Sequence, residues 1–425
     1  MITVIIGSGG REHAIAYKVA QSKSLTKLFI IPGNPGTKKY GENIEINVDD
    51  KASVLKFCKD NNVDLVIIGP EKPLTDGLTD VLVNEGLKVF GPSKSAARIE
   101  GDKSFAKNLM KDFGIPTTAF EVFNKTEFDK VLEYLKNVNY PTVIKANGLA
   151  AGKGVIIAES FDEAKSAVQL CFVDAAFGSA GDTIVIEEFM TGQEASIFAV
   201  TDGNDFILLP AAQDHKRIWD GDKGKNTGGM GSYAPTPFVN DNIMNLVAEK
   251  IIKPTIEAMN KTGNKYVGCL YCGLMLTPNG PKVVEFNCRF GDPETQVVLP
   301  LLEGDILDLF FSCASGKINK DSVKYNGGAS VCVVVASKGY PDSYEKGKVI
   351  SGIDSVENDE VVVYHAGTKE VNGSILTNGG RVLGVTSTLK SNDLRKAKDT
   401  AYNAIGKINF EGMQYRKDIS DKALI

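Results

Sequence analysis

The chain has 425 residues, of which 43% are hydrophobic and 24% are charged. These fractions exclude a disordered or fibrous protein, and at about 150 residues per domain the length predicts two to four domains. The formal charge of −5 comes without a block of like charges. Neither nucleic acid nor a membrane surface is therefore an expected partner.

The N-terminal segment and the cysteines indicate the compartment. Only residues 4–6 are continuously apolar before a polar stretch, so no secretion signal is expected, and no apolar run approaches the roughly 18 residues of a membrane span. Seven scattered cysteines favour free thiols over a disulfide framework. Cys269 and Cys272 stand three apart on an expected strand, which places them on opposite faces and argues against a shared zinc ion. We expect a cytoplasmic protein.

The first hundred residues alternate short β-branched runs with helical patterns. Strands are expected at 3–6, 27–31, 65–69 and 88–91, with helices around 13–21, 52–61 and 78–84. Such an alternation predicts a parallel sheet, so this region is expected to form a Rossmann-like domain.

The pattern changes after residue 100 to a mixture of elements. A helix at 103–113, strands at 140–146, 155–158 and 183–188, and a helix at 161–170 predict a compact α+β subdomain. Strands at 268–276 and 282–288 then precede helical segments at 294–302 and 305–315. A glycine pair at 327–328 opens a β-rich tail that ends in a helix at 393–408.

A glycine-rich turn, GSGGREH at 7–13, joins the first strand to the first helix. Backbone amides at a helix N-terminus favour an anion such as a phosphate or a carboxylate. A dinucleotide is disfavoured, because Glu12 stands where its fingerprint needs glycine and the second strand does not close on an acidic residue. Loops at 32–36 and 69–71 are expected at the same carboxyl edge of the sheet, where ligands bind. The alternative is that the glycines only form a tight turn.

A second glycine-rich segment, KANGLAAGKG at 145–154, lies between two strands. It is not a Walker A loop, since Asn147 stands where that motif needs glycine and Gly154 where it needs serine or threonine. We expect a mobile hairpin whose amides close over phosphate oxygens, with Lys145 and Lys153 supplying positive charge. A purely structural turn is the alternative.

Acidic residues follow the next strand. Glu187 and Glu188 end it, and Glu194 comes shortly after. Such acids are usually solvated surface residues. Their place between the lysine hairpin and the segment described next makes them candidate nucleoside contacts.

The most informative segment is VVEFNCRFGDPETQ at 283–296. Strand alternation predicts one face that points to the core and one polar face, with Val284, Phe286 and Cys288 opposite Glu285, Asn287 and Arg289. Glu285 and Asn287 are oxygen ligands suited to Mg²⁺, and Arg289 can grip a carboxylate or phosphate in a bidentate manner. The alternative is a solvated amphipathic strand.

A polar, glycine-rich loop at 212–231 is expected to face a ligand. Its histidine, His215, is equally compatible with a structural and a catalytic role, and the same caution applies to His13 and His365.

Taken in order, these motifs resemble one family along almost the whole chain. They are GSGGREHA, GNPG, GPE, GPSKSAA, KANGLAAGKGV, VIEEF, QDHKR, NTGGMG, EFNCRFGDPETQ, HAGT and NGGRVLGV, and they resemble the phosphoribosylamine–glycine ligases. RFGDPETQ is the most specific of them. The resemblance implies an α/β and α+β multidomain ATP-grasp enzyme. Its parts would be a Rossmann-like substrate-binding N-domain (1–100), an ATP-grasp region (101–325) with a lid subdomain at about 119–190, and a small β-rich C-terminal domain (326–425).

The resemblance also implies a reaction and residue roles. ATP, glycine and 5-phospho-β-D-ribosylamine would give glycinamide ribonucleotide, ADP and phosphate through glycyl phosphate, a step of purine biosynthesis, with no obligate protein partner. The implied ATP contacts are Lys103, Lys145, Gly148, Gly152, Lys153, Gly154, Glu187, Glu188, Phe189 and Glu194. The implied Mg²⁺ or Mn²⁺ ligands are Glu285 and Asn287. The implied substrate contacts are Gly9, Gly10, Arg11, Asn34, Pro35, Gly36, Glu71, Asp214, Arg289 and Asp292, of which Asp214 and Arg289, together with Lys145, would act in catalysis.

One departure and two rival functions accompany this resemblance. The family more often has aspartate where this chain has Asn147, a change expected to affect ATP affinity without removing a catalytic group. A different ATP-grasp ligase, such as a carboxylase that uses bicarbonate, would share the ATP-binding half but not RFGDPETQ together with GGREH. A nucleotide-binding module without catalysis is disfavoured by the intact Glu285, Asn287 and lysines.

Overall fold

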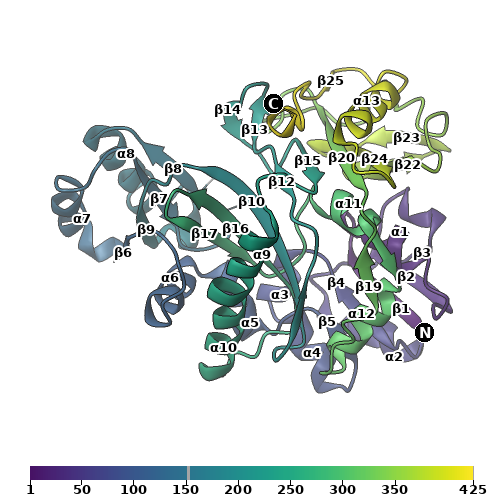
Figure 1. Ribbon diagram of the computed structural model, residues 1–425, viewed down its shortest axis with the longest axis horizontal. Helices are drawn as coiled ribbons and strands as arrows, with labels where there is room; N and C mark the ends of the chain where they lie inside the picture. Colours follow the sequence, from purple (N-terminus) through teal and green to yellow (C-terminus); the bar gives the residue numbers. More distant parts are fainter. Residues whose placement is uncertain (151–153, 425) are drawn as a thin grey trace.

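The computed structural model describes residues 1–150 and 154–424. A small subdomain, for which we keep the predicted name lid, lies at one end of the molecule, the N-terminal and C-terminal parts lie at the other, and a central sheet lies between them (Figure 1). None of the helices in these residues is long and apolar enough to cross a membrane.

The N-terminal part is a parallel five-stranded sheet in the order β3-β2-β1-β4-β5, as the alternation of strands and helices predicts. Its strands are β1 (Ile2–Gly7), β2 (Lys27–Pro32), β3 (Glu42–Asn43), β4 (Leu65–Ile68) and β5 (Lys88–Phe90). Its helices are α1 (Gly10–Val19), α2 (Lys51–Asp60), α3 (Glu71–Thr75), α4 (Leu78–Asn84) and α5 (Lys94–Gly101). Successive residues such as Ile5 and Ile6 belong to different apolar cores, because a parallel sheet is covered on both faces.

The lid is an antiparallel sheet in the order β6-β9-β7-β8 with its own apolar core. It contains β6 (Phe120–Asn124), β7 (Thr142–Ala146), β8 (Val155–Ala158), β9 (Thr183–Glu188), α7 (Phe128–Leu135) and α8 (Phe161–Phe172). The helix α6 (Lys103–Asp112) connects it to the N-terminal part and begins where the carboxylate of Asp102 accepts a hydrogen bond from the Phe105 amide at 3.0 Å.

The central sheet runs β11-β10-β16-β17 and is antiparallel. Its strands are β10 (Gln193–Thr201), β11 (Phe206–Leu208), β16 (Gly268–Thr277) and β17 (Gly280–Asn287). One face packs on the helical segment α9 (Asp241–Val247), Ala248–Ile252 and α10 (Lys253–Lys261), and the other packs on α12 (Ile306–Ala314). Cys272 belongs to the first core and Cys269 to the second, so the prediction that they face opposite ways is confirmed.

The predicted faces of β17 are partly wrong. Phe286 and Cys288 do face the core, but Val283, which is fully buried, takes the place expected for Val284. The reason is an irregularity in the pairing with β16, where Gly273 pairs with Glu285 and the next residue pairs with Val283, so that Val284 has no partner. Such a bulge shifts the alternation by one residue, and Val284 consequently faces a pocket.

The C-terminal part is a sheet in the order β12-β15-β20-β24-β21, with β25 paired to β20. Its strands are β12 (Gln213–Asp214), β15 (Gly231–Ala234), β20 (Ala329–Ser337), β21 (Val361–His365), β24 (Arg381–Leu389) and β25 (Met413–Gln414). The helix α13 (Leu394–Ile405) packs on this sheet. Three further strand pairs lie outside it: β13 (Arg217–Trp219) with β14 (Lys223–Asn226), β18 (Leu302–Gly304) with β19 (Val323–Tyr325), and β22 (Thr368–Val371) with β23 (Ser374–Thr377). The polar loop at 212–231 therefore contributes β12 and the first residue of β15 to this sheet, and it also contains the separate pair β13–β14.

The predicted helix at 294–302 is shorter in the structure. The helix α11 (Thr295–Val298) continues as a 3-10 turn (Leu299–Leu301) that contains Pro300. Proline has no N–H for the helical hydrogen bond, so the regular helix ends early.

Candidate active site

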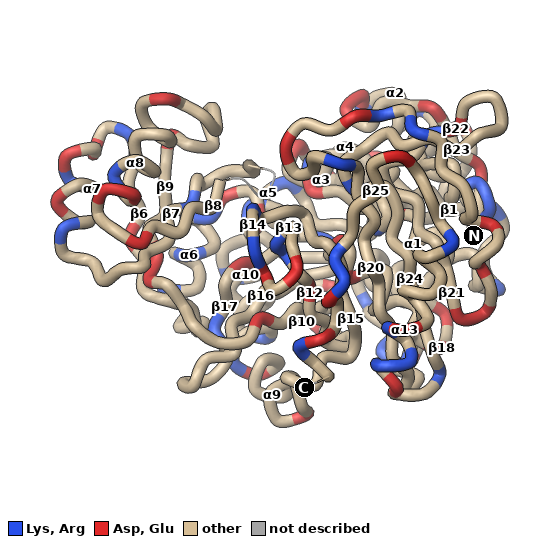
Figure 2. Tube along the Cα trace, turned by 90° about the horizontal axis from the view of Figure 1, so that it is seen from above, with Lys and Arg blue, Asp and Glu red and all other residues tan. Residues whose placement is uncertain are grey.

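Charged residues of both signs are interspersed along the trace (Figure 2), so local charge density does not mark the site. Burial does, because a charge removed from water needs a partner or a function. Two groups of buried charges stand out, one where the lid meets α6 and one where the chain after β17 meets the N-terminal part.

Glu187 on β9 faces two lysines. Its carboxylate lies 2.9 Å from Lys145 Nζ through Oε1 and 2.9 Å from Lys107 Nζ through Oε2, and none of the three side chains is more than 6% exposed. The contact to Lys145 is an ion pair without the alignment of a hydrogen bond. Burial lowers the pKa of Lys107 to about 8, against the opposing effect of Glu187. Lys145 is thereby held near the end of β7.

Asn147 ties the glycine-rich segment to α6. Its Nδ2 donates to the Asp102 carboxylate at 3.1 Å, and its Oδ1 accepts from the Ser104 amide at 2.6 Å. An aspartate here could not donate to Asp102 and would repel it, so the amide suits this chain. Lys103 Nζ donates to the Gly148 carbonyl at 3.1 Å, and burial lowers the pKa of Lys103.

The other glycine-rich candidates have mixed outcomes. Gly154 is described and lies close to Ala150, whereas Gly152 and Lys153 lie outside the described residues. At the end of β9, Glu188 is exposed and Phe189 is 36% exposed, so both are available to a ligand.

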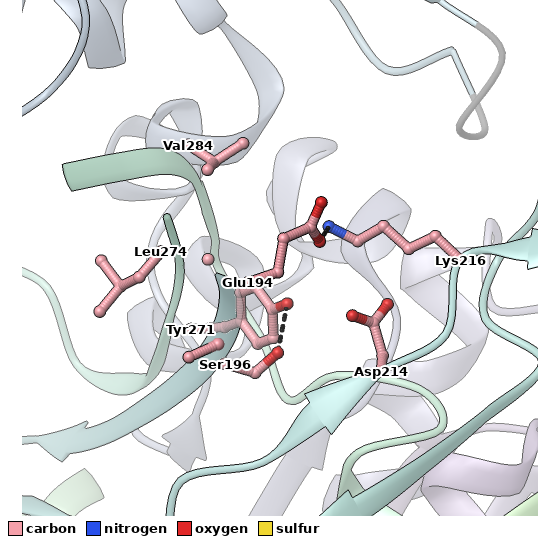
Figure 3. A pocket seen from close by; sticks show the side chains of 9 residues that line it. Glu194, Ser196, Asp214, Lys216, Tyr271, Leu274 and Val284 are labelled. Carbon is pink, nitrogen blue, oxygen red and sulfur yellow. Dashed lines mark hydrogen bonds and ion pairs between the residues drawn. The ribbon is translucent and has the colours of Figure 1, made fainter. Parts of the chain in front are cut away.

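A pocket opens beside β10, β12 and β16 (Figure 3). Glu194 and Lys216 point toward one another, 2.7 Å apart, and the carboxylate of Asp214 lies nearby. Burial raises the pKa of Asp214 to about 7, opposed by Lys216 and reinforced by the neighbouring carboxylates. Burial alone would lower the pKa of Lys216, but Glu194 and Asp214 raise it well above the ordinary value.

The wall of this pocket includes a buried hydrogen-bond network. The Ser196 hydroxyl lies 2.9 Å from the Tyr271 hydroxyl and donates to Glu294 Oε1 at 3.1 Å. Burial raises the pKa of Tyr271 well above its ordinary value. The lining of the pocket therefore combines carboxylates with a neutral phenol.

Glu285 and Asn287 stand two residues apart on β17, as predicted. Burial would raise the pKa of Glu285, but Lys216, Lys145 and Lys103 together lower it, so the carboxylate is ionised at neutral pH. One carboxylate and one amide oxygen fit Mg²⁺, which usually keeps waters and phosphate oxygens among its ligands. The described residues contain no group of three or more His, Cys, Asp or Glu side chains that could hold a metal ion alone.

Arg289 is fixed between two glutamates. Its guanidinium contacts Glu100 Oε1 at 2.8 Å and Glu71 Oε2 at 3.3 Å. Burial would raise the pKa of Glu71, but Arg289 and Arg11 lower it to about 2, whereas burial raises the pKa of Glu100. Glu100 also accepts a hydrogen bond from the Cys288 amide at 2.7 Å, which fixes the end of β17.

Asp292 lies against the first glycine-rich turn. A Cβ added to Gly10 would stand 3.7 Å from Asp292 Oδ1, and one added to Gly9 would stand 3.7 Å from Oδ2. Arg381 on β24 holds the same carboxylate at 2.9 Å. Arg11 NH1 donates to the Phe290 carbonyl at 3.1 Å, so loops from three parts of the chain meet here.

The loop after β2 is used for structure as well. Asn34 Nδ2 donates to the carbonyls of Ser8 and His365, each at 2.9 Å, and its Oδ1 accepts from the Gly36 amide at 2.9 Å. A Cβ on Gly36 would stand 2.2 Å from Cε1 of His13, so glycine is required. Asn34 and Pro35 also line a groove between this loop and the β22–β23 hairpin.

The three histidines are buried and neutral. The Nδ1 atom of His13 accepts a hydrogen bond from the His365 amide at 2.8 Å, and burial lowers the pKa of both. Burial also lowers the pKa of His215 to about 3. A proton-transfer role near neutral pH is therefore disfavoured, and the structural interpretation of these residues is favoured.

Several residues at the site had no role in the sequence predictions. Lys107 could have been predicted from the sequence, since it stands four residues after Lys103 and therefore on the same helical face. Lys216 and Arg381 lie within recognised motifs, whereas nothing in the sequence around Glu100 marks it as a partner of Arg289.

The fold and the site together define the class: an ATP-grasp enzyme with a cluster of buried lysines where the small antiparallel subdomain meets α6. The biotin carboxylase domain of a Hydrogenobacter thermophilus 2-oxoglutarate carboxylase shares this fold, with a TM-score of 0.74 over 97% of this chain and 91% of that one, at 15% identity. Family models for the phosphoribosylglycinamide synthetase N domain, ATP-grasp (A) domain and C domain match residues 1–100, 101–295 and 330–422.

Similar proteins point the same way. The chain is 46% identical to a phosphoribosylamine–glycine ligase of Caldanaerobacter subterraneus over 99% of both chains, and 47% identical to one of Leptospira interrogans over 99% of this chain and 98% of that one. A crystal structure of the Thermotoga maritima phosphoribosylamine–glycine ligase superposes with a TM-score of 0.84 at 36% identity, covering 99% of this chain and 100% of that one. The chain belongs to the phosphoribosylglycinamide synthetase family, and the predicted family and fold class are confirmed.

Proposed function

We propose that this chain ligates glycine to 5-phospho-β-D-ribosylamine with ATP, giving glycinamide ribonucleotide, ADP and phosphate. The single observation that carries this proposal is the approach of Asp292 to the Gly9–Gly10 turn, because Asp292 follows β17, the strand of Glu285, in the same segment of chain. The proposed phosphate-transfer region and the proposed anion-binding turn are thereby joined by one continuous segment. The relatives over the full length carry the name of this ligase.

The chemistry divides into two balanced steps. A carboxylate resists attack by an amine, so the γ-phosphoryl group of ATP is first transferred to a glycine carboxylate oxygen, which gives glycyl phosphate and ADP. The amine of phosphoribosylamine then attacks the acyl carbon, and phosphate leaves with the C–O bond electrons while the nitrogen loses a proton. Such transfers depend chiefly on positioning and on neutralising charge.

The nucleotide is assigned to the lid side of the site. Lys103, Lys145, Gly148 and Gly154, with Gly152 and Lys153, would contact its phosphates. Glu187 would orient Lys145, and Glu188 and Phe189 would border the adenine. Glu194 would accept hydrogen bonds from the ribose, because its side chain is 43% exposed beside Lys216.

Glu285 and Asn287 would hold Mg²⁺ or Mn²⁺. The bound ion would neutralise phosphate charge during transfer. An ionised Glu285 beside Asn287, close to the lysines that would contact the phosphates, supports this assignment.

The sugar phosphate and glycine are assigned to the N-terminal side. Gly9, Gly10 and Arg11 would bind the phosphate of phosphoribosylamine, while Asn34, Pro35 and Gly36 shape the adjoining loop. Glu71 and Asp292 would border the substrate. Arg289 would hold the glycine carboxylate, and Asp214 would receive the amine proton.

The domain boundaries at residues 100 and 325, and the lid at about 119–190, remain part of this proposal. The separate apolar core of the lid supports its independence. A cytoplasmic location is supported by seven free, buried cysteines, a state typical of reducing compartments.

The test is phosphate release from ATP, Mg²⁺ and glycine, with and without freshly generated phosphoribosylamine. Release that requires both substrates, with glycinamide ribonucleotide as product, supports the proposal. Release with bicarbonate in place of glycine would point to a carboxylase instead. Glu285→Ala should abolish ligation, while the matched surface variant Glu249→Ala, at a side chain 69% exposed, should retain it.

A further inference from the structure

The β13–β14 hairpin directly follows, along the chain, residues that line the candidate active site. Lys216 precedes its first strand, and Gly229, which follows its second strand, packs against Pro293. The two strands pair only with each other. An isolated two-stranded hairpin is marginally stable in water, so the position of this one depends on what it docks against.

The hairpin docks on the C-terminal segment 416–422, which lies beside it in Figure 1. At the centre is Arg416, whose side chain is completely buried. Its NH1 donates to Asp222 Oδ1 at 2.9 Å and to the Arg217 carbonyl at 3.1 Å, both on the hairpin. Its Nε and NH2 make a bidentate contact with Asp418 at 2.7 and 2.6 Å.

Further contacts surround this arginine. Asp220 accepts a hydrogen bond from the Lys417 amide, and Asp418 accepts one from the Gly221 amide, both at 2.8 Å. Lys422 forms an ion pair with Asp222. The arginine and lysine charges are therefore balanced by two carboxylates, one from each side of the contact.

The same segment reaches the other end of the active-site loop. A Cβ on Gly231 would stand 2.7 Å from Ile419 Cδ1. The segment is itself anchored to α13, because the Tyr402 hydroxyl donates to the Arg416 carbonyl at 2.8 Å and accepts from the Ile419 amide at 3.1 Å. Both ends of the loop that carries Lys216 thus rest on one anchored segment.

We propose that Arg416 is a positioning residue, which fixes the β13–β14 hairpin on the C-terminal segment and so holds Lys216 in the nucleotide pocket. The kinetic part of this inference rests on the proposed function. Arg416 touches neither the pocket nor a proposed substrate contact, so it acts through the hairpin.

The hairpin contains an intrinsic fluorescent probe, the side chain of Trp219. Trp219 is the only tryptophan of the chain, is 54% exposed, and packs on Gly224, whose added Cβ would stand 2.5 Å from Trp219 Cδ1. Its fluorescence therefore reports the hairpin without any engineered probe.

The test compares Arg416→Met and Asp222→Asn with the control Asp342→Asn. Asp222 has a positive φ of 53°, which asparagine tolerates, so that substitution removes charge without straining the turn. Asp342 contacts Lys225 on the same hairpin, but both side chains are at least 60% exposed, and such pairs contribute little. The readouts are acrylamide quenching of Trp219 without substrates, KM and kcat for ATP, and the melting temperature.

Arg416→Met and Asp222→Asn should each make Trp219 about 1.5-fold more quenchable, since it is already 54% exposed. Each should also lower kcat/KM about tenfold, mainly through KM for ATP, since small misplacements of binding groups are costly. Asp342→Asn should leave both unchanged. A lowered melting temperature with unchanged quenching and KM would overturn the proposal, since the arginine would then be only structural. If Arg416→Met does not fold, Asp222→Asn decides alone. If the variants show altered quenching but the wild-type protein shows no ligation, the docking role of Arg416 stands and the proposed reaction is overturned instead.

Discussion

At the residue scale, Glu187 shows how one carboxylate organises two cations. Acidic residues at a strand end are usually solvated, yet here the carboxylate is buried and faces both Lys107 and Lys145. A phosphate arriving near Lys145 would compete with Glu187 for the same ammonium group. The second lysine eases that competition, because Lys107 continues to compensate Glu187 when Lys145 turns to the ligand.

Lys107→Met should therefore weaken nucleotide binding as well as the fold. Removing the ammonium group of Lys107 leaves Lys145 as the only ion-pair partner of the buried Glu187 carboxylate. We therefore expect a loss of about 2 kcal/mol of unfolding free energy. Lys145 would then be less available to phosphate, and ADP affinity should fall about tenfold by calorimetry. Lys111→Met, at an exposed position on the same helix, is the control. Unchanged ADP affinity in Lys107→Met would contradict this account.

Asp214 gives a prediction about pH. Burial raises its pKa to about 7, so the carboxylate is protonated below that pH and ionised above it. If it accepts the amine proton, kcat/KM for phosphoribosylamine should rise with pH through about 7. Asp214→Asn should lose about 100-fold in kcat/KM, in line with general-base catalysis. The ratio of wild-type to variant rates cancels the ionisation of the substrates, and a ratio that stays constant with pH would exclude this role.

At the element scale, β17 shows what the sequence can and cannot predict. Its existence, its position, and the shared face of Glu285 and Asn287 follow from strand alternation. The bulge opposite Gly273 does not, because it arises from pairing with β16, which alternation within one strand cannot reveal. The contacts of Arg289 with Glu100 were likewise unpredictable, since the two residues are brought together only by the packing of the N-terminal part on β17.

The adjacent valines test the bulge directly. Val283→Ala should cost about 2 kcal/mol of unfolding free energy, because Val283 is fully buried in the core. Val284→Ala should cost much less, since this side chain is half-buried and lines the pocket, but it should alter ADP affinity. Denaturant unfolding and calorimetry on the two variants measure both quantities. If Val284→Ala cost more stability than Val283→Ala, Val284 would be the core residue, as the simple strand alternation predicts, and the bulge would be contradicted.

At the scale of the whole molecule, the N-terminal and C-terminal parts are joined by buried histidines. His13 on α1 accepts the His365 amide, and the two rings lie 5.7 Å apart among Tyr17, Tyr40 and Tyr364. Loops that would bind the sugar phosphate pass over this contact, since Asn34 donates to the His365 carbonyl. The integrity of the proposed substrate site thus depends on an interface whose two histidines resist protonation because they are buried.

This interface predicts a loss of stability in mild acid. Burial lowers the pKa of His365 to about 4, below its ordinary value, so beneath about pH 6.5 the unfolded chain binds a proton that the folded chain excludes. The stabilising contribution is complete above that pH and falls progressively toward pH 4. Between about pH 7.5 and pH 5 the linkage amounts to about 2 kcal/mol for His365. Burial also lowers the pKa of His13, so this residue acts in the same direction.

His365→Asn isolates the effect. An asparagine amide can replace the contact of the His365 Nδ1 atom with Thr368 Oγ1, which is 3.0 Å long, but it does not titrate. The variant should therefore lose about 2 kcal/mol less stability than the wild type when urea unfolding is compared at about pH 7.5 and pH 5. Taking the difference between the two proteins removes the titration of all other groups. Equal losses would mean that His365 is protonated without breaking the interface, and that the acid sensitivity of the junction lies elsewhere.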